Sequence, residues 1–211
     1  MPNPAPSPAY QRFLNSLNIG LEEWREGIGY DTKALAEITP EERTAAVDLL
    51  RQRLRDRGDW RDVEALAAIG TPEAREAILV AQHHSDFKVR LRAAELLQEA
   101  GEDTRIEEQI ISALRGADLQ SGLSQAIDLA EQHPTSRVQQ TLRHVALNGR
   151  TPEARVNCAG MALYLGGQAD EAFDWNHRPF FLRFGEEDRA VRLEAYRELC
   201  QLIGVPPEEQ A

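Results

Sequence analysis

The sequence predicts an all-α protein in which short helices follow one another as antiparallel hairpins. Three observations lead to this fold class. Apolar residues recur at the three- and four-residue spacing of one helix face through most of the chain. Helix-capping residues and glycines bracket these apolar stripes at short intervals. No segment shows the sustained alternation of apolar and polar residues that marks a strand, so we expect essentially no β-structure.

Proline dominates the start of the chain, because residues 1–8 contain four prolines. Such a composition favours extended, unpacked conformations. Residues 1–10 are therefore predicted to be a disordered lead-in, and residues 11–211 a single helical-repeat domain.

The first well-marked helix opens at Thr39-Pro40-Glu41-Glu42, with a capping Thr, a Pro at the first helical position and acids in the first turn. It is predicted to end at Gly58, because glycine readily closes a helix. Asp59 opens the next helix, which is predicted to end before Gly70.

The same succession of caps and stops continues to the end of the chain. Further predicted helix starts are Thr71, Asp86, Asp103 or Thr104, the stretch at Leu123, Thr135, Thr151 and about Glu187. Predicted stops are Gly101, His133-Pro134, Gly149, Gly166-Gly167 and Ile203. The connections are short, so consecutive helices are expected to pack antiparallel.

Internal repetition indicates stacked units. Thr-Pro-Glu-Ala-Arg occurs at 71–75 and again at 151–155, and the pattern of residues 86–97, from Asp through Val-Arg and Ala to Leu, has a close echo at 188–199. A weaker echo lies at 154–166. The stretch 71–101 resembles one two-helix unit of a HEAT-like repeat. This resemblance implies an irregular HEAT-like α-solenoid, a class of scaffold that binds partners on its concave surface.

The chain is acidic, with a formal net charge of -11. Acidic residues outnumber basic ones in each of the segments 1–60, 61–116 and 117–211. Because this charge repels phosphate backbones, we expect no nucleic-acid partner. A basic protein partner suits the charge better, although solubility alone also explains it.

No constellation of residues indicates chemistry. The five histidines form no pair on one helix face, and no Cys-x-x-Cys, P-loop or Gly-x-Ser-x-Gly motif is present. Cys158 and Cys200 fall on apolar helix faces, so we interpret them as buried core residues in a reducing compartment. The sequence therefore predicts no catalytic residue, no cofactor and no metal site, and we expect a protein that is not an enzyme.

Two aromatic segments, 21–31 and 173–184, depart from the repeat pattern. Trp, Tyr and Arg often anchor protein interfaces, so these segments and the start of the helix at 60 supply the candidate partner-binding residues. These are Trp24, Tyr30, Asp31, Trp60, Asp174, Trp175, His177, Arg178 and Arg183. The alternative is a structural plug. Both hold if the phenylalanines of 173–184 point inward and its polar residues and Trp175 point outward.

The whole chain also resembles small bacterial HEAT-type proteins found beside secreted polymorphic toxins. The residues that carry this resemblance are 19–24, 27–31, 59–62 and 174–184. It implies an immunity or antitoxin role, in which an acidic surface occludes a basic toxin. The alternatives are a general scaffold or assembly chaperone, and an enzyme adaptor of the chromophore-lyase HEAT type. With no signal peptide and no stretch of about 20 apolar residues, we expect a monomeric cytoplasmic protein that does not bind membranes.

Overall fold

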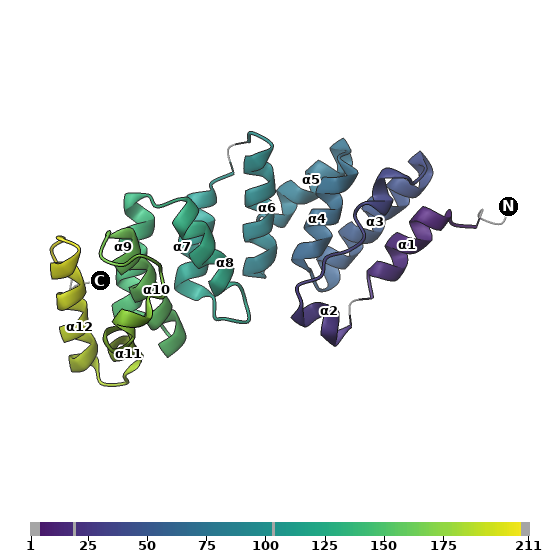
Figure 1. The fold of residues 1–211 in the computed structure, drawn as a ribbon. Coiled ribbons are helices and arrows are strands. Elements are labelled where there is room, and N and C mark those ends of the chain that lie inside the picture. Colours follow the sequence, from purple (N-terminus) through teal and green to yellow (C-terminus); the bar gives the residue numbers. More distant parts are fainter. Residues whose placement is uncertain (1–4, 19, 103, 208–211) are drawn as a thin grey trace. The chain divides into compact units, whose positions relative to one another are not determined.

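Every regular element in the described part of the chain is a helix (Figure 1), which confirms the predicted all-α class. The structure, a computed structural model, describes residues 5–18, 20–102 and 104–207, apart from the side chains of Glu23 and Trp24. Its contacts divide the chain into two compact units, residues 1–104 and 105–211. The sequence predicts a single domain over residues 11–211, and each unit is described by itself below.

The first unit begins inside the predicted lead-in. Ser7 caps α1 (Pro8–Ser16), and its backbone N–H and hydroxyl both donate to the Glu42 carboxylate, at 2.6 and 2.8 Å. Residues 7–10 are therefore packed on the helical unit, while residues 1–4 lie outside the described residues. The remaining elements are α2 (Leu21–Arg25), η1 (Ala34–Ala36), α3 (Pro40–Asp56), α4 (Trp60–Ile69), α5 (Pro72–Ala81) and α6 (Phe87–Glu99).

Two hairpins, α3–α4 and α5–α6, form the body of this unit in two layers. Helix α4 packs extensively on both α5 and α6, whereas α3 and α5 lie side by side with fewer contacts between them. The interior is aliphatic, and Leu50, Val63, Leu66 and Val89 are fully buried in it. The first layer, α3 and α5, is therefore more open than the second layer, α4 and α6.

The second unit contains three hairpins. The last one packs in the opposite order, because its first helix contacts the second helix of the hairpin before it. Its elements are α7 (Ile106–Gly116), α8 (Leu123–Gln132), α9 (Ser136–Asn148), α10 (Pro152–Leu165), η2 (Trp175–His177), α11 (Arg178–Gly185) and α12 (Arg189–Leu202). Helix α7 packs on α9, and α8 packs on α10. In the third hairpin the first helix, α11, packs on α10, while α12 contacts both α9 and α10.

The sequence echoes correspond to equivalent structural positions. Arg90, Arg155 and Arg192 each lie near the start of the second helix of a hairpin, α6, α10 and α12. Each guanidinium turns back to donate to the carbonyl six residues earlier. The acceptors are His84 at 3.1 Å, Gly149 at 3.1 Å and Glu186 at 2.7 Å. These arginines fasten the inter-helix loop to the helix that follows it.

The repeated Thr-Pro-Glu-Ala-Arg motif opens both α5 and α10, as predicted, but its arginines differ. Thr71 and Thr151 each accept the N–H three residues on, at 3.2 and 3.1 Å. Arg75 is exposed and pairs with Glu102 at 2.6 Å, whereas Arg155 is buried. Identical local sequences therefore give the same cap, while the packing around each helix decides what its arginine contacts.

The segment between α10 and η2 crosses α10 at Gly160. A β-carbon at this position would collide with the carbonyl oxygen of Ala172 and would approach the Phe173 ring at 3.6 Å. Glycine is otherwise unfavourable in a helix interior. Its presence in the middle of α10 is explained by this close approach, which positions the start of the aromatic segment.

We predict that Gly160→Ala destabilises the protein by about 2 kcal/mol, because the overpacked backbone has to move. The measurement is the free energy of unfolding in urea. The matched control is Gly185→Ala in α11, where the added carbon meets only Val156 at an ordinary 3.5 Å. The control is expected to change stability by less than about 1 kcal/mol. Equal stability of the two variants would contradict the close approach.

Candidate protein-binding surface

The predicted segment 173–184 forms an exposed corner of the second unit. Asp174 begins η2 by accepting the backbone N–H of Asn176 at 2.9 Å. Trp175 follows with 72% of its side chain exposed, and the guanidinium carbon of Arg178 lies 4.7 Å from the centre of its ring. The cation–π contact holds both large side chains in one orientation at the surface.

Buried phenylalanine side chains hold this segment against the core of the unit. Phe181 and Phe184 are buried, and Phe180 meets Phe184 edge to face with ring centres 5.5 Å apart. Arg155 of α10 donates to the carbonyl oxygens of Phe184 at 2.8 Å and Gly185 at 3.1 Å. The sequence leaves open an arrangement with the phenylalanines inward and Trp175 outward, and Phe181, Phe184 and Trp175 adopt it. Segment 173–184 is at once a structural plug and an exposed surface.

Phe173 departs from that division, because 48% of its side chain is exposed. Leu182 is 52% exposed, and Pro179 is exposed as well. We refer to Phe173, Trp175, Arg178, Pro179 and Leu182 together as the aromatic surface. The sequence does not indicate Leu182 as a surface residue, because it does not predict a helix over residues 178–185. Once α11 is known, the four-residue spacing from Arg178 to Leu182 places both on one face.

His177 and Arg183 are engaged within the unit. The His177 ring is half-buried with its centre 6.0 Å from that of Phe181. Arg183 forms an ion pair with Glu198 of α12 and lies over the Phe180 ring at 5.9 Å. Both residues therefore border the aromatic surface and help to fix α11 in place.

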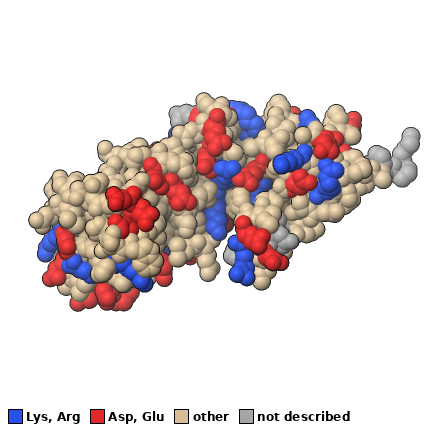
Figure 2. Space-filling model, viewed as in Figure 1, with Lys and Arg blue, Asp and Glu red and all other residues tan. Residues whose placement is uncertain are grey.

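Exposed carboxylates flank the aromatic surface in the chain. Asp170 and Glu171 precede it, and Glu186, Glu187 and Asp188 follow α11. Figure 2 shows acidic and basic groups interspersed over the visible face of each unit. The aromatic surface is thus bounded along the chain by negative charge on both sides.

The N-terminal candidates are largely internal to the first unit. Trp24 belongs to α2, but its side chain lies outside the described residues. Tyr30 is only 6% exposed. Its hydroxyl donates to the Asp62 carboxylate at 3.1 Å and accepts from Arg53 at 2.7 Å, while the Arg53 Nε–H donates to the same carboxylate at 2.8 Å. Burial and the adjacent carboxylate raise the pKa of Tyr30, so the phenol stays protonated and can donate.

Asp31 and Arg61, the residue after Trp60, fasten the same loop to the helices. Asp31 accepts the Ala34 N–H at 3.2 Å and lies 3.7 Å from Arg12. Arg61 is buried, donates to the Ile28 carbonyl at 2.8 Å and lies 4.5 Å from the centre of the Trp60 ring. Tyr30 thus joins the loop to α3 and α4, Asp31 joins it to α1, and Trp60 packs on Arg61 of α4. All three lie in a different unit from the aromatic surface.

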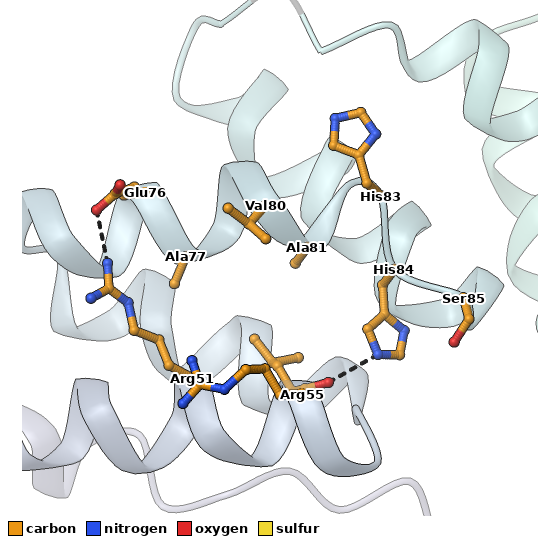
Figure 3. A pocket seen from close by; sticks show the side chains of 10 residues that line it. Arg51, Arg55, Glu76, Ala77, Val80, Ala81, His83, His84 and Ser85 are labelled. Atoms are coloured by element: carbon orange, nitrogen blue, oxygen red, sulfur yellow. Dashed lines mark hydrogen bonds and ion pairs between the residues drawn. The ribbon is translucent and has the colours of Figure 1, made fainter.

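A groove that sequence analysis did not identify lies between α3 and α5 (Figure 3). It has a volume of about 630 Å³, and its walls include Arg51, Leu54 and Arg55 of α3 and Glu76, Ala77 and Val80 of α5. Arg51 reaches across it to Glu76 at 2.9 Å. The groove arises because two separate helices stand apart, which no local pattern in the sequence indicates.

His84 closes one end of this groove and joins the two hairpins. Its Nδ1 accepts the Asp86 N–H at 3.0 Å, so the proton of the neutral ring sits on Nε2 and is donated to the Leu54 carbonyl at 3.1 Å. The imidazole thereby satisfies a carbonyl at the end of α3. His84 is a packed structural residue and lines the groove as a neutral group.

The remaining candidates for chemistry are the histidines, the cysteines and the carboxylates. Among the described residues, no three His, Cys, Asp or Glu side chains are placed to hold a metal ion. Cys158 and Cys200 are buried, as predicted, and burial raises the pKa of the Cys158 thiol, which keeps it protonated. Within the described part of the chain, no helix combines the length and the apolar character needed to cross a membrane.

Comparison of this chain with protein-family models, with curated proteins and with solved structures finds no match.

We predict that Tyr30→Phe lowers the free energy of unfolding by about 1–2 kcal/mol, because Arg53 and Asp62 each lose a buried hydrogen-bond partner. The control is Tyr164→Phe, whose hydroxyl donates to the exposed Glu131 carboxylate at 3.0 Å and whose loss is expected to leave stability nearly unchanged. Chemical denaturation followed by circular dichroism compares them. Indistinguishable midpoints for the two variants would show that the Tyr30 network does not stabilise the fold.

Proposed function

We propose that this chain is a non-enzymatic protein-binding module of HEAT-like repeat character, and that the aromatic surface is its main contact with a protein partner. The observation that carries the proposal is the exposure of Trp175 with Arg178 stacked upon it. Exposed apolar patches that are rimmed by polar residues often mark protein-interaction sites. Trp and Arg are also the residue types that contribute most to interface energy.

The rigidity of the corner supports this proposal. Binding costs free energy when flexible side chains and loops become ordered. Here Phe181 and Phe184 are already packed in the core, and Arg155 already holds the end of α11. A partner would therefore meet a preformed surface and would lose little affinity to ordering.

Charge supports a basic partner. The net charge is -11, and the carboxylates at 170–171 and 186–188 flank the aromatic surface. Such an arrangement attracts a positively charged protein and accelerates its association. An apolar pocket of the partner would cover Trp175 and Leu182, while its basic residues would lie against the flanking carboxylates.

The most concrete form of this proposal is an immunity-type inhibitor that sequesters a basic toxin by occluding its active site. It rests on the acidic charge, on the aromatic surface and on the sequence resemblance to HEAT-type proteins encoded beside toxins. Inhibition would then be steric and electrostatic, and it would need no chemistry from the inhibitor.

The first test is affinity capture from a lysate of the source organism with the full chain as bait. We expect a basic protein to be retained stoichiometrically by the wild-type chain and lost with a Trp175→Ala/Leu182→Ala bait. For the isolated partner, the double substitution is expected to weaken binding by about 100-fold, since two interface anchors are removed. Inhibition of the partner's activity by the wild-type chain then tests the immunity form.

Leu119→Ala is the matched control. Leu119 lies in the second unit and is 48% exposed, the same fraction as Phe173, but it is in the connection between α7 and α8. This variant is expected to retain the partner. Identical proteins captured by the wild-type chain and the double variant, or an acidic partner, would refute the proposal.

A further inference from the structure

The groove between α3 and α5 continues beyond the region of Figure 3. A second hollow of about 390 Å³ adjoins it and shares Arg51 with it. The second hollow is lined by Pro40, Arg43, Thr44, Val47, Asp48, Arg51, Thr71 and Glu73. Together the two hollows follow α3 from Pro40 to Arg55, a length of about 22 Å at 1.5 Å per residue. Arg51, which the two hollows share, reaches across to Glu76, so an elongated occupant such as a helix of about four turns would lie over this ion pair.

The floor of the groove is apolar. Val47, Leu54, Ala77 and Ala81 form it with little exposure, and Val80 stands at its edge with 68% of its side chain exposed. Two of these residues, Val47 and Leu54, come from α3, and the others come from α5. A helix lying in the groove would bury the Val80 side chain and would contact both walls.

The α3 wall carries hydrogen-bond donors. Arg43, Arg51 and Arg55 all line it. The Nε–H of Arg43 is buried and has no acceptor among the described residues. Arg55 is exposed and donates at 2.8 Å to Gln52 of its own helix. Two of the three guanidinium groups are thus not neutralised by a carboxylate across the groove.

The acidic groups along the groove leave this donor wall open. Glu76 is paired with Arg51, and Glu73 contributes its backbone carbonyl to the same arginine at 2.8 Å. Asp48 and Glu73 are exposed to solvent. In Figure 3 the His83 side chain points away from α3, and His84 is the neutral ring described above. At this end of the groove Arg55 thus contributes a guanidinium group that donates to Gln52 and is not paired with a carboxylate of α5, in a chain whose net charge is -11.

We propose that this groove binds an amphipathic helix of a protein partner that carries carboxylates on the side facing α3. The apolar stripe of that helix would lie on Val80, Ala77 and Leu54, and its carboxylates would accept from the exposed Arg55 and lie beside the Arg43 guanidinium group. The groove is a separate binding site from the aromatic surface. It lies in the other unit and selects the opposite charge, so the chain would bind two different kinds of surface.

The test uses two synthetic probes, because their sequence can be set by the groove. One is a fluorescein-labelled amphipathic helical peptide of about 15 residues, with leucines on one face and glutamates on both flanks. The other has every glutamate replaced by lysine. Fluorescence anisotropy with the full chain measures affinity, and amide chemical-shift changes locate the bound peptide. We expect the glutamate peptide to bind with shifts along α3 and α5, and the lysine peptide to bind at least about tenfold more weakly.

Val80→Glu and Arg55→Glu are the groove variants. Each is expected to lower the affinity of the chain for the glutamate peptide by about tenfold. Both positions are exposed, so the fold should persist, and circular dichroism verifies it. Leu182→Glu in the aromatic surface is the matched control and is expected to leave this affinity unchanged. The proposal is overturned by equal binding of the two peptides, by shifts confined to other helices, or by no binding of the glutamate peptide.

Discussion

Short helices have to bury one face against their neighbours, and this requirement governs the rest of the structure. The longest helix in the described residues, α3, has 17 residues, and most are nearer ten to fourteen. Isolated helices of such length are marginal in water. Each helix therefore depends on packing, and Leu50, Leu66 and Leu142 show the consequence, since they are fully buried between layers. Surfaces become available for binding only where this layered packing is interrupted.

The two interruptions in the structure differ in origin. In the second unit, the third hairpin packs on α10 through its first helix, and the segment leading to it crosses Gly160. This path brings Phe173, Trp175 and Leu182 to the surface while Phe181 and Phe184 fill the core. In the first unit, α4 and α6 pack closely but α3 and α5 do not, which leaves a groove between the more open pair.

Local features of the fold were predictable, and features that depend on distant residues were not. Thr39, Asp59 and Thr71 cap helices as predicted, because capping is decided by residues within one turn. The departure of segment 173–184 from the repeat pattern singled out Trp175, but whether this segment is exposed or a structural plug was left open by the sequence and is settled by the packing around it. The burial of Tyr30 could not be foreseen, because its partners Arg53 and Asp62 come from α3 and α4. The α3–α5 groove has no sequence signal either, since it is a space between helices.

Arginine placement also decides how the formal charge is presented to a partner. Arg61 and Arg155 are buried, and Arg90, Arg155 and Arg192 donate to loop carbonyls of their own units. Positive groups are thereby engaged in holding the fold, while carboxylates such as Asp170, Glu171 and Glu186 stay exposed. The same structural use of arginine that stabilises the hairpins thus suits the proposed basic partner, and the exposed Arg178, stacked on Trp175, belongs to the proposed contact.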